Sequence, residues 1–158
     1  PDVKDKFSVA KQFWESIKSI DGFGDEKGKE KTVAMQPVVL KALAKLVYDF
    51  KFGKKLSEKS ESYYQTLLEG ISNLDFSHSN KIWQYYEMSE SERKNLFPGA
   101  DRYLPNEESG NRDLGSLNAG LMRFGAKHND IYPVIGDMIR YQLQLPSRHS
   151  AMNNDLFN

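Results

Sequence analysis

The residues best suited to binding a ligand form a basic segment at positions 123–130, ahead of the last helical pattern in the chain. Arg123, Lys127 and His128 can carry positive charge immediately before the point where we expect a helix to start. The free backbone amides of a helix N-terminus and the helix dipole both favour an anion there. The segment therefore predicts a phosphate-binding site, and we include Arg112 among its cations.

The same segment has a second interpretation. Asn129 or Asp130 can cap the helix, with the neighbouring cations simply solvated. Residues 100–158 hold six Lys or Arg against seven Asp or Glu, so no broad basic surface surrounds the segment. A phosphate site must therefore be local.

An aromatic cluster, Trp83, Tyr85 and Tyr86, is the other candidate contact surface. Such side chains can stack on nucleic-acid bases or provide contact area to a protein partner. Large aromatic side chains also fill hydrophobic cores, and the cluster can equally close a small core over the preceding helices. The sequence leaves both interpretations open.

Composition limits the function classes. The 158 residues contain 22 Lys or Arg and 22 Asp or Glu, so no net charge draws the chain to nucleic acid or anionic lipid. The absence of cysteine excludes disulfides and thiol chemistry and fits a reducing compartment, which makes the cytoplasm the expected location. No apolar run is long enough to span a membrane, and we expect no membrane partner.

Catalytic and metal-binding patterns are missing from the sequence. The histidines His78, His128 and His149 are not spaced as metal-ligand pairs. The sequence also lacks a Gly-x-Ser-x-Gly elbow, a Walker loop and a dinucleotide-binding glycine motif. We therefore expect no metal and no cofactor, and an enzyme is the least favoured class.

Hydrophobic periodicity predicts three helices in the first half of the chain. The first covers residues 5–20, with Phe7, Trp14 and other apolar residues on one face, and a charged loop follows at 21–31. The second starts at Pro37 and stops at Gly53. The third is capped by Ser60 or Ser57 and ends near Leu74.

The second half is more irregular. Residues 81–86 form a short helix or an extended run, and Ser89 with Glu92 predicts a capping box for a short helix that ends before Pro98. Glycines then recur through residues 98–125, which predicts an ordered loop with short helical turns. The last helix continues to Leu143 and is stopped by Pro146.

We expect an all-α, or mainly α, fold: an irregular multi-helix bundle with a long ordered glycine-containing loop before the last helix. Residues 1–146 form one domain, and residues 147–158 form a flexible tail.

Two stretches of the chain resemble a known family. The helix residues Leu68-Glu69-Gly70-Ile71 lead into Asp75-Phe76-Ser77-His78-Ser79-Asn80-Lys81-Ile82-Trp83. This order is similar to the C-terminal part of the DGQHR-domain, DndB-like family of DNA sulfur modification proteins, where a leucine-rich helix precedes an Asp-aromatic-Ser-x-Ser-Asn-x-x-Trp stretch. The likeness covers residues 7–83. The signature Asp-Gly-Gln-His-Arg is absent, which implies that an N-terminal domain of the family lies outside this chain.

The resemblance implies an accessory DNA-interaction or transcription-regulatory module of a DNA phosphorothioation-associated protein, with DNA as a partner. The alternative is a protein-interaction or dimerisation module that makes no nucleic-acid contact. Its partner would be the missing N-terminal domain or a second copy of the chain.

Overall fold

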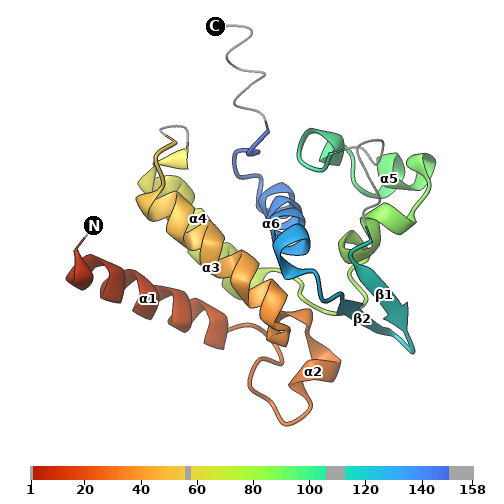
Figure 1. Cartoon of the computed structure of the whole chain (residues 1–158), viewed down its shortest axis with the longest axis horizontal. Helices are drawn as coiled ribbons and strands as arrows, with labels where there is room; N and C mark the ends of the chain where they lie inside the picture. The colour runs from red at the N-terminus through yellow and green to blue at the C-terminus, as the bar shows by residue number, and fades with distance from the viewer. Residues whose placement is uncertain (1, 56–57, 106–112, 150–158) are drawn as a thin grey trace, which may run out of the picture.

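The computed structural model describes residues 2–55, 58–105 and 113–149. Most of its ordered elements are helices, and Figure 1 shows the four long ones diagonally across the molecule, with a small hairpin at one side. The long helices are α1 (Val3–Lys18), α3 (Pro37–Phe52), α4 (Glu61–Asn73) and α6 (His128–Leu143). The short ones are α2 (Gly28–Lys31), η1 (Val33–Met35), η3 (Lys81–Glu87), α5 (Glu90–Leu96) and η4 (Ala100–Arg102).

Local end signals set the helix boundaries as predicted in α3, in α5 and at the end of α6, whereas α1 begins and ends two residues earlier than predicted. Helix α3 begins at Pro37, which gives up no intrahelical hydrogen bond at that position, and ends before Gly53. The predicted capping box of α5 is confirmed: Ser89 accepts a hydrogen bond from the amide of Glu92, and the Glu92 carboxylate accepts one in return from the amide of Ser89. Helix α6 ends at Leu143, ahead of Pro146.

Helix α3 lies at the centre of the core. It packs against α4 on one side and α6 on the other, and α1 lies mainly against α4 (Figure 1). Its buried face consists of Val38, Val39, Ala42, Leu43, Leu46, Val47 and Phe50. Gly70 allows α4 to approach α6 closely, because a Cβ atom at that position would lie 2.4 Å from a methyl carbon of Leu143.

The apolar residues of α1 do not all face the core, although their spacing predicted a single buried stripe. Val9 and Ile17 are buried, whereas Phe7 and Trp14 are exposed. The reason is that α1 packs mainly against one neighbour, α4, and so buries only one side of the helix. Its remaining apolar residues form a second, solvent-facing line.

A two-stranded sheet corrects the prediction of an all-α fold, although the chain is mainly helical. Strands β1 (Gly115–Asn118) and β2 (Leu121–Phe124) pair antiparallel, with Leu117 opposite Met122, inside the segment predicted to be a loop. Their turn has φ of 52° at Ala119 and 78° at Gly120. Two left-handed residues define a tight hairpin turn that normally carries Asn-Gly. Because alanine occupies the first of these positions, the sequence lacks the Asn-Gly pair that would have predicted a hairpin.

Residues 147–149, the first three of the predicted flexible tail, make hydrogen bonds within the described part of the chain. The Ser147 hydroxyl donates to the carbonyl of Arg102, and Arg148 binds both carboxylate oxygens of the buried Asp137, at 2.7 and 2.9 Å. The side-chain hydrogen bond to Asp137 raises the pKa of the Arg148 guanidinium. These residues belong to the folded domain, whereas residues 150–158 lie outside the described part.

Replacing Ala119 with asparagine is expected to stabilise the domain. An L-residue other than Asn, Asp or Gly costs roughly 1–2 kcal/mol in the left-handed region, and asparagine relieves part of this strain. The free energy of unfolding, measured by urea denaturation, should rise by up to about 1 kcal/mol in Ala119→Asn. The matched control is Ala126→Asn, because Ala126 is also exposed but has no left-handed backbone. An equal gain in both variants would contradict the turn assignment.

Candidate functional site

The predicted cations meet at the β2–α6 junction, which we define as residues 123–130. Arg123 lies on β2 opposite Ser116, and strand alternation directs it away from the buried Met122. Lys127 is the residue before α6, and His128 is the first residue of the helix. Within the described residues, the side chains of Arg123 and Lys127 form no hydrogen bond or ion pair, and both are exposed. These three residues thus lie in one short segment at the start of α6, whereas Arg112 lies outside the described residues.

The helix amides contribute less than the sequence predicted. The amide of His128 donates to the carbonyl of Ala126 at 2.9 Å, and the amide of Asp130 donates to that of Lys127 at 3.0 Å. Two of the first three amides of α6 are therefore already used. Neither Asn129 nor Asp130 caps the helix, because the capping position is Lys127, which makes no side-chain capping bond. An anion at this junction would be held mainly by side chains.

Lys41 joins the junction from α3 and was not predicted as a site residue. Its ammonium group donates to the side-chain oxygen of Asn129 at 2.9 Å and lies 4.6 Å from the centre of the Tyr132 ring. Because 88 residues separate Lys41 from Asn129, no local pattern could have indicated this contact. Lys41 adds a fourth basic group to the edge of the site.

A cavity of about 600 Å³ lies beside the junction, and Lys127 is on its wall. Two carboxylates, Asp113 and Asp130, line the same cavity. Their negative charge disfavours an anion inside the hollow. The arrangement suits a phosphate at the exposed side chains of Arg123 and Lys127, outside the cavity, better than a small anionic ligand enclosed within it.

Strand β2 is fixed in place by two side chains along the edge that β1 does not pair. The amide of Met122 donates to Nδ1 of His78 at 2.8 Å. Gln36 accepts a hydrogen bond from the amide of Phe124 at 2.9 Å and donates to the carbonyl of Met122 at 2.8 Å. These side chains take the place of a third strand. They fix the position of Arg123 relative to α3 and to the turn that holds His78.

His78 occupies a buried position with both ring nitrogens bonded. Because Nδ1 accepts from Met122, the ring proton is on Nε2, which donates to the carbonyl of Lys29 at 2.8 Å. His78 thus connects α2, its own turn and β2. Its role is structural, and it is not exposed to bind a ligand.

The turn around His78 is held by its own polar groups. Asn80 donates to the carbonyl of Asp75 at 2.8 Å and caps η3 by accepting from the amide of Ile82. The indole of Trp83 donates to the carbonyl of Ser77 at 3.1 Å, and its ring stacks on Phe76. The residues that resemble the family stretch therefore stabilise this turn.

The aromatic cluster belongs to the core and its margin. Trp83 is 1% exposed and Tyr85 is 5% exposed, so these two side chains offer no surface for stacking or for a partner. Tyr86 is half-buried and donates to the carbonyl of Pro105 at 2.7 Å. The large apolar area of Trp83 and Tyr85 packs η3 onto the core, and their burial leaves little of either side chain for the predicted interaction surface.

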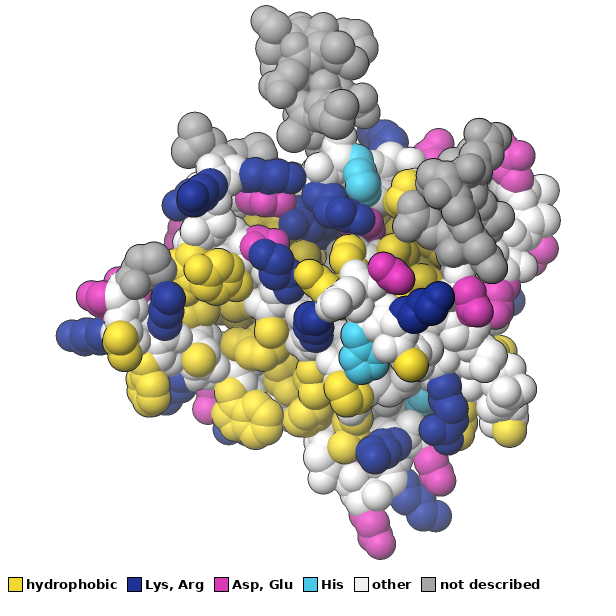
Figure 2. All heavy atoms as spheres, in the orientation of Figure 1, with side chains coloured by type: hydrophobic (Ala, Val, Ile, Leu, Met, Phe, Trp, Pro, Cys, Tyr) yellow, Lys and Arg dark blue, Asp and Glu magenta, His cyan; other side chains and the backbone are white. Residues whose placement is uncertain are grey.

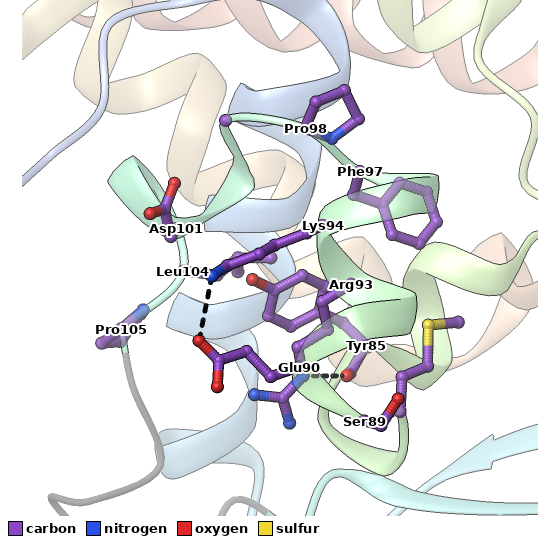
Figure 3. Close-up of a pocket in the computed structure, with 12 residues that line it drawn as sticks. Tyr85, Ser89, Glu90, Arg93, Lys94, Phe97, Pro98, Asp101, Leu104 and Pro105 are labelled. Carbon is purple, nitrogen blue, oxygen red and sulfur yellow. Dashed lines mark hydrogen bonds and ion pairs between the residues drawn. The ribbon is translucent and has the colours of Figure 1, made fainter.

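A larger cavity, of about 880 Å³, opens between α5 and the turn that follows it (Figure 3). Arg93 extends along its wall, donates to the carbonyl of Tyr85 at 2.9 Å and stacks on that ring, while Lys94 pairs with Glu90 at 3.1 Å. Both cations already contact protein groups, and Asp101 adds a second carboxylate to the lining. The cavity is therefore a weaker anion site than the exposed junction.

Removing the side chain of His78 or of Gln36, which bind the edge of β2 that β1 leaves unpaired, is expected to destabilise the domain. His78→Ala leaves two backbone groups unpaired and should lower the free energy of unfolding by about 1–3 kcal/mol. Gln36→Ala should cost about 1–2 kcal/mol, because Gln36 is only half-buried. Both variants should also speed amide hydrogen exchange at residues 122–124, which NMR can measure.

A matched control separates this effect from loss of side-chain volume. Gln65→Ala removes the same side-chain type as Gln36→Ala from an exposed position on α4, and it should keep the parent stability within about 0.5 kcal/mol. Unchanged exchange at residues 122–124 in Gln36→Ala would show that the strand does not depend on this contact.

Comparison with known proteins gives one match. A family model described as DndB, DNA-sulfur modification-associated, matches residues 4–133. No curated protein and no solved structure matches the chain. The matched range contains α1 except its first residue, the His78 turn, both strands and the whole β2–α6 junction. The chain therefore belongs to the DndB family of DNA-sulfur modification-associated proteins.

Proposed function

We propose that this chain is an accessory DNA-interaction module with a regulatory role in DNA sulfur modification. The β2–α6 junction contacts the phosphate backbone of DNA. The observation that carries this proposal is the pair of exposed cations, Arg123 and Lys127, which have no ionic partner among the described residues. His128 and Lys41 provide further hydrogen-bond donors at the same place.

The rigidity of the junction supports this proposal. A long cationic side chain loses conformational freedom when it binds, so a fixed backbone lowers the ordering cost of each phosphate contact. Strand β2 is held on one edge by β1 and on the other by Gln36 and His78. Arg123 is therefore presented from a backbone that does not have to be ordered on binding.

Charge distribution sets the kind of DNA binding that is expected. Figure 2 shows dark-blue basic side chains dispersed among magenta acidic ones, with no broad basic face on this side of the molecule. With 22 basic and 22 acidic residues, the chain as a whole does not attract DNA. A few local phosphate contacts give weak binding that does not depend on base sequence. Such contacts suit a module that positions a larger assembly on DNA.

The salt dependence of DNA binding tests this proposal. In a fluorescence anisotropy titration with duplex DNA at several salt concentrations, Arg123→Ala and Lys127→Ala should each weaken binding to all duplex sequences alike. Each should also reduce the slope of log K against log salt by about one, the loss of one phosphate contact. Lys94→Ala is the matched control: it removes an exposed lysine that is paired with Glu90 on α5.

Circular dichroism should show that all three variants remain folded, because their side chains are exposed. Slopes equal to the parent slope in both junction variants would place DNA contact elsewhere or exclude it. Binding by the parent that does not respond to salt would argue against phosphate contacts altogether.

A further inference from the structure

Helix α1 presents an apolar line to solvent along two heptads. Val3, Phe7 and Trp14 are 83%, 72% and 52% exposed, and Ala10 between them is exposed as well. Their spacing of four, three and four residues places them on one side of the helix. We call these four residues the α1 seam. The ring of Phe23 meets Trp14 edge-on, with centroids 6.1 Å apart, and so orients one end of the seam.

The seam is part of a larger apolar surface. Figure 2 shows yellow side chains gathered at the lower left, over α1 and the adjacent α3. Single exposed apolar residues are ordinary on soluble proteins, but a contiguous group of large ones marks an interaction site.

The period of the seam indicates the shape of its partner. Residues 3, 7, 10 and 14 occupy alternating d and a positions of a heptad repeat, the pattern that packs one helix along another. A helix that lies in a membrane interface instead has a wide apolar face. On α1 itself the exposed apolar residues are limited to the four positions of the seam, and this narrow face favours a helical protein partner over a lipid surface.

The charges beside the seam indicate the chemistry of that partner. Lys4, Lys11 and Lys18 follow one another seven residues apart on one flank of the seam, and Lys6 lies on the other flank. These are the e and g positions, whose charges select the partner helix. The nearby carboxylate of Glu15 already pairs with Lys18 at 3.1 Å.

The same lysines disfavour a second copy of α1 as the partner. In an antiparallel pair, e positions face e positions, so Lys4 would meet Lys18 and Lys11 would meet Lys11 of the other copy. In a parallel pair, e positions face g positions, and Lys11 would meet Lys6. Both arrangements place like charges together, whereas acidic flanks on a different helix would complement every lysine.

We propose that the α1 seam docks an amphipathic helix of another polypeptide segment whose apolar seam is flanked by glutamate or aspartate. This inference goes beyond the DNA contact proposed above and does not depend on it, because the seam and the β2–α6 junction share no residue.

Two designed helical peptides test the proposal with the 158-residue chain. Both carry leucine at the a and d positions; one has glutamate at e and g, and the other has lysine there. Fluorescence anisotropy of labelled peptide measures affinity, and Trp14 emission should shift to the blue as the seam is covered. The glutamate peptide should bind at least about tenfold more tightly than the lysine peptide, and added salt should reduce that preference.

Variants locate the binding site and test the role of charge. Phe7→Ser should weaken binding of the glutamate peptide by about tenfold or more, as expected for loss of a central aromatic contact. Leu96→Ser is the matched control, because Leu96 is 47% exposed but lies on α5. The double charge reversal Lys4→Glu and Lys11→Glu should invert the preference, so that the lysine peptide binds more tightly. Inversion cannot arise from a general loss of folding.

Other outcomes would overturn the proposal. These are equal binding of the two peptides, no binding of either, or binding that survives Phe7→Ser. Two further measurements address other occupants. A dimer in sedimentation equilibrium that Phe7→Ser dissociates would assign the seam to a second copy. A Trp14 blue shift with anionic phospholipid vesicles but with neither peptide would assign it to a membrane surface.

Discussion

The outer edge of β2 is paired by side chains, and the arrangement of the second half of the chain depends on this. A two-stranded hairpin is at best marginally stable on its own in water. Here His78 and Gln36 satisfy three backbone groups of Met122 and Phe124 that would otherwise need another strand or water. In this way the hairpin is attached to the start of α3 and to the turn before η3. Because β2 leads directly into α6, the same contacts also fix where that helix begins.

This constraint gives a physical meaning to the stretch that resembles the DndB-like family. Its polar residues bond to the backbone of their own turn, as Asn80 and Trp83 do, or reach other segments, as His78 does. Its aromatic residues stack inside the core. The contacts described for this stretch thus hold its own turn and join it to other segments, so its described role is to maintain the fold.

Two exposed surfaces remain, and they differ in chemistry. The β2–α6 junction offers cations held by a fixed backbone, whereas the α1 seam offers apolar side chains flanked by lysine. In Figure 1 helix α1 and the hairpin lie on opposite sides of the molecule, separated by α3 and α6. The two proposed contacts would therefore not compete for one surface of the molecule. Among the described residues, no helix is long and apolar enough to cross a membrane.

The sequence by itself determined both ends of α3, the start of α5 and the end of α6. Pro37, Gly53 and the Ser89 capping box act on the backbone within one turn of their own positions. The helix boundaries that they set can therefore be predicted without knowledge of the fold. The sequence also placed three cations beside the start of α6, because that proximity is local in the chain.

Tertiary structure decided which groups are exposed and which are already bonded. The spacing of α1 showed an apolar stripe, but only its packing against α4 determined that Phe7 and Trp14 would face solvent. The contacts of His78 with Met122 and of Lys41 with Asn129 join residues 44 and 88 positions apart. Local spacing carries no information about such pairs, because they form only when the whole core has assembled.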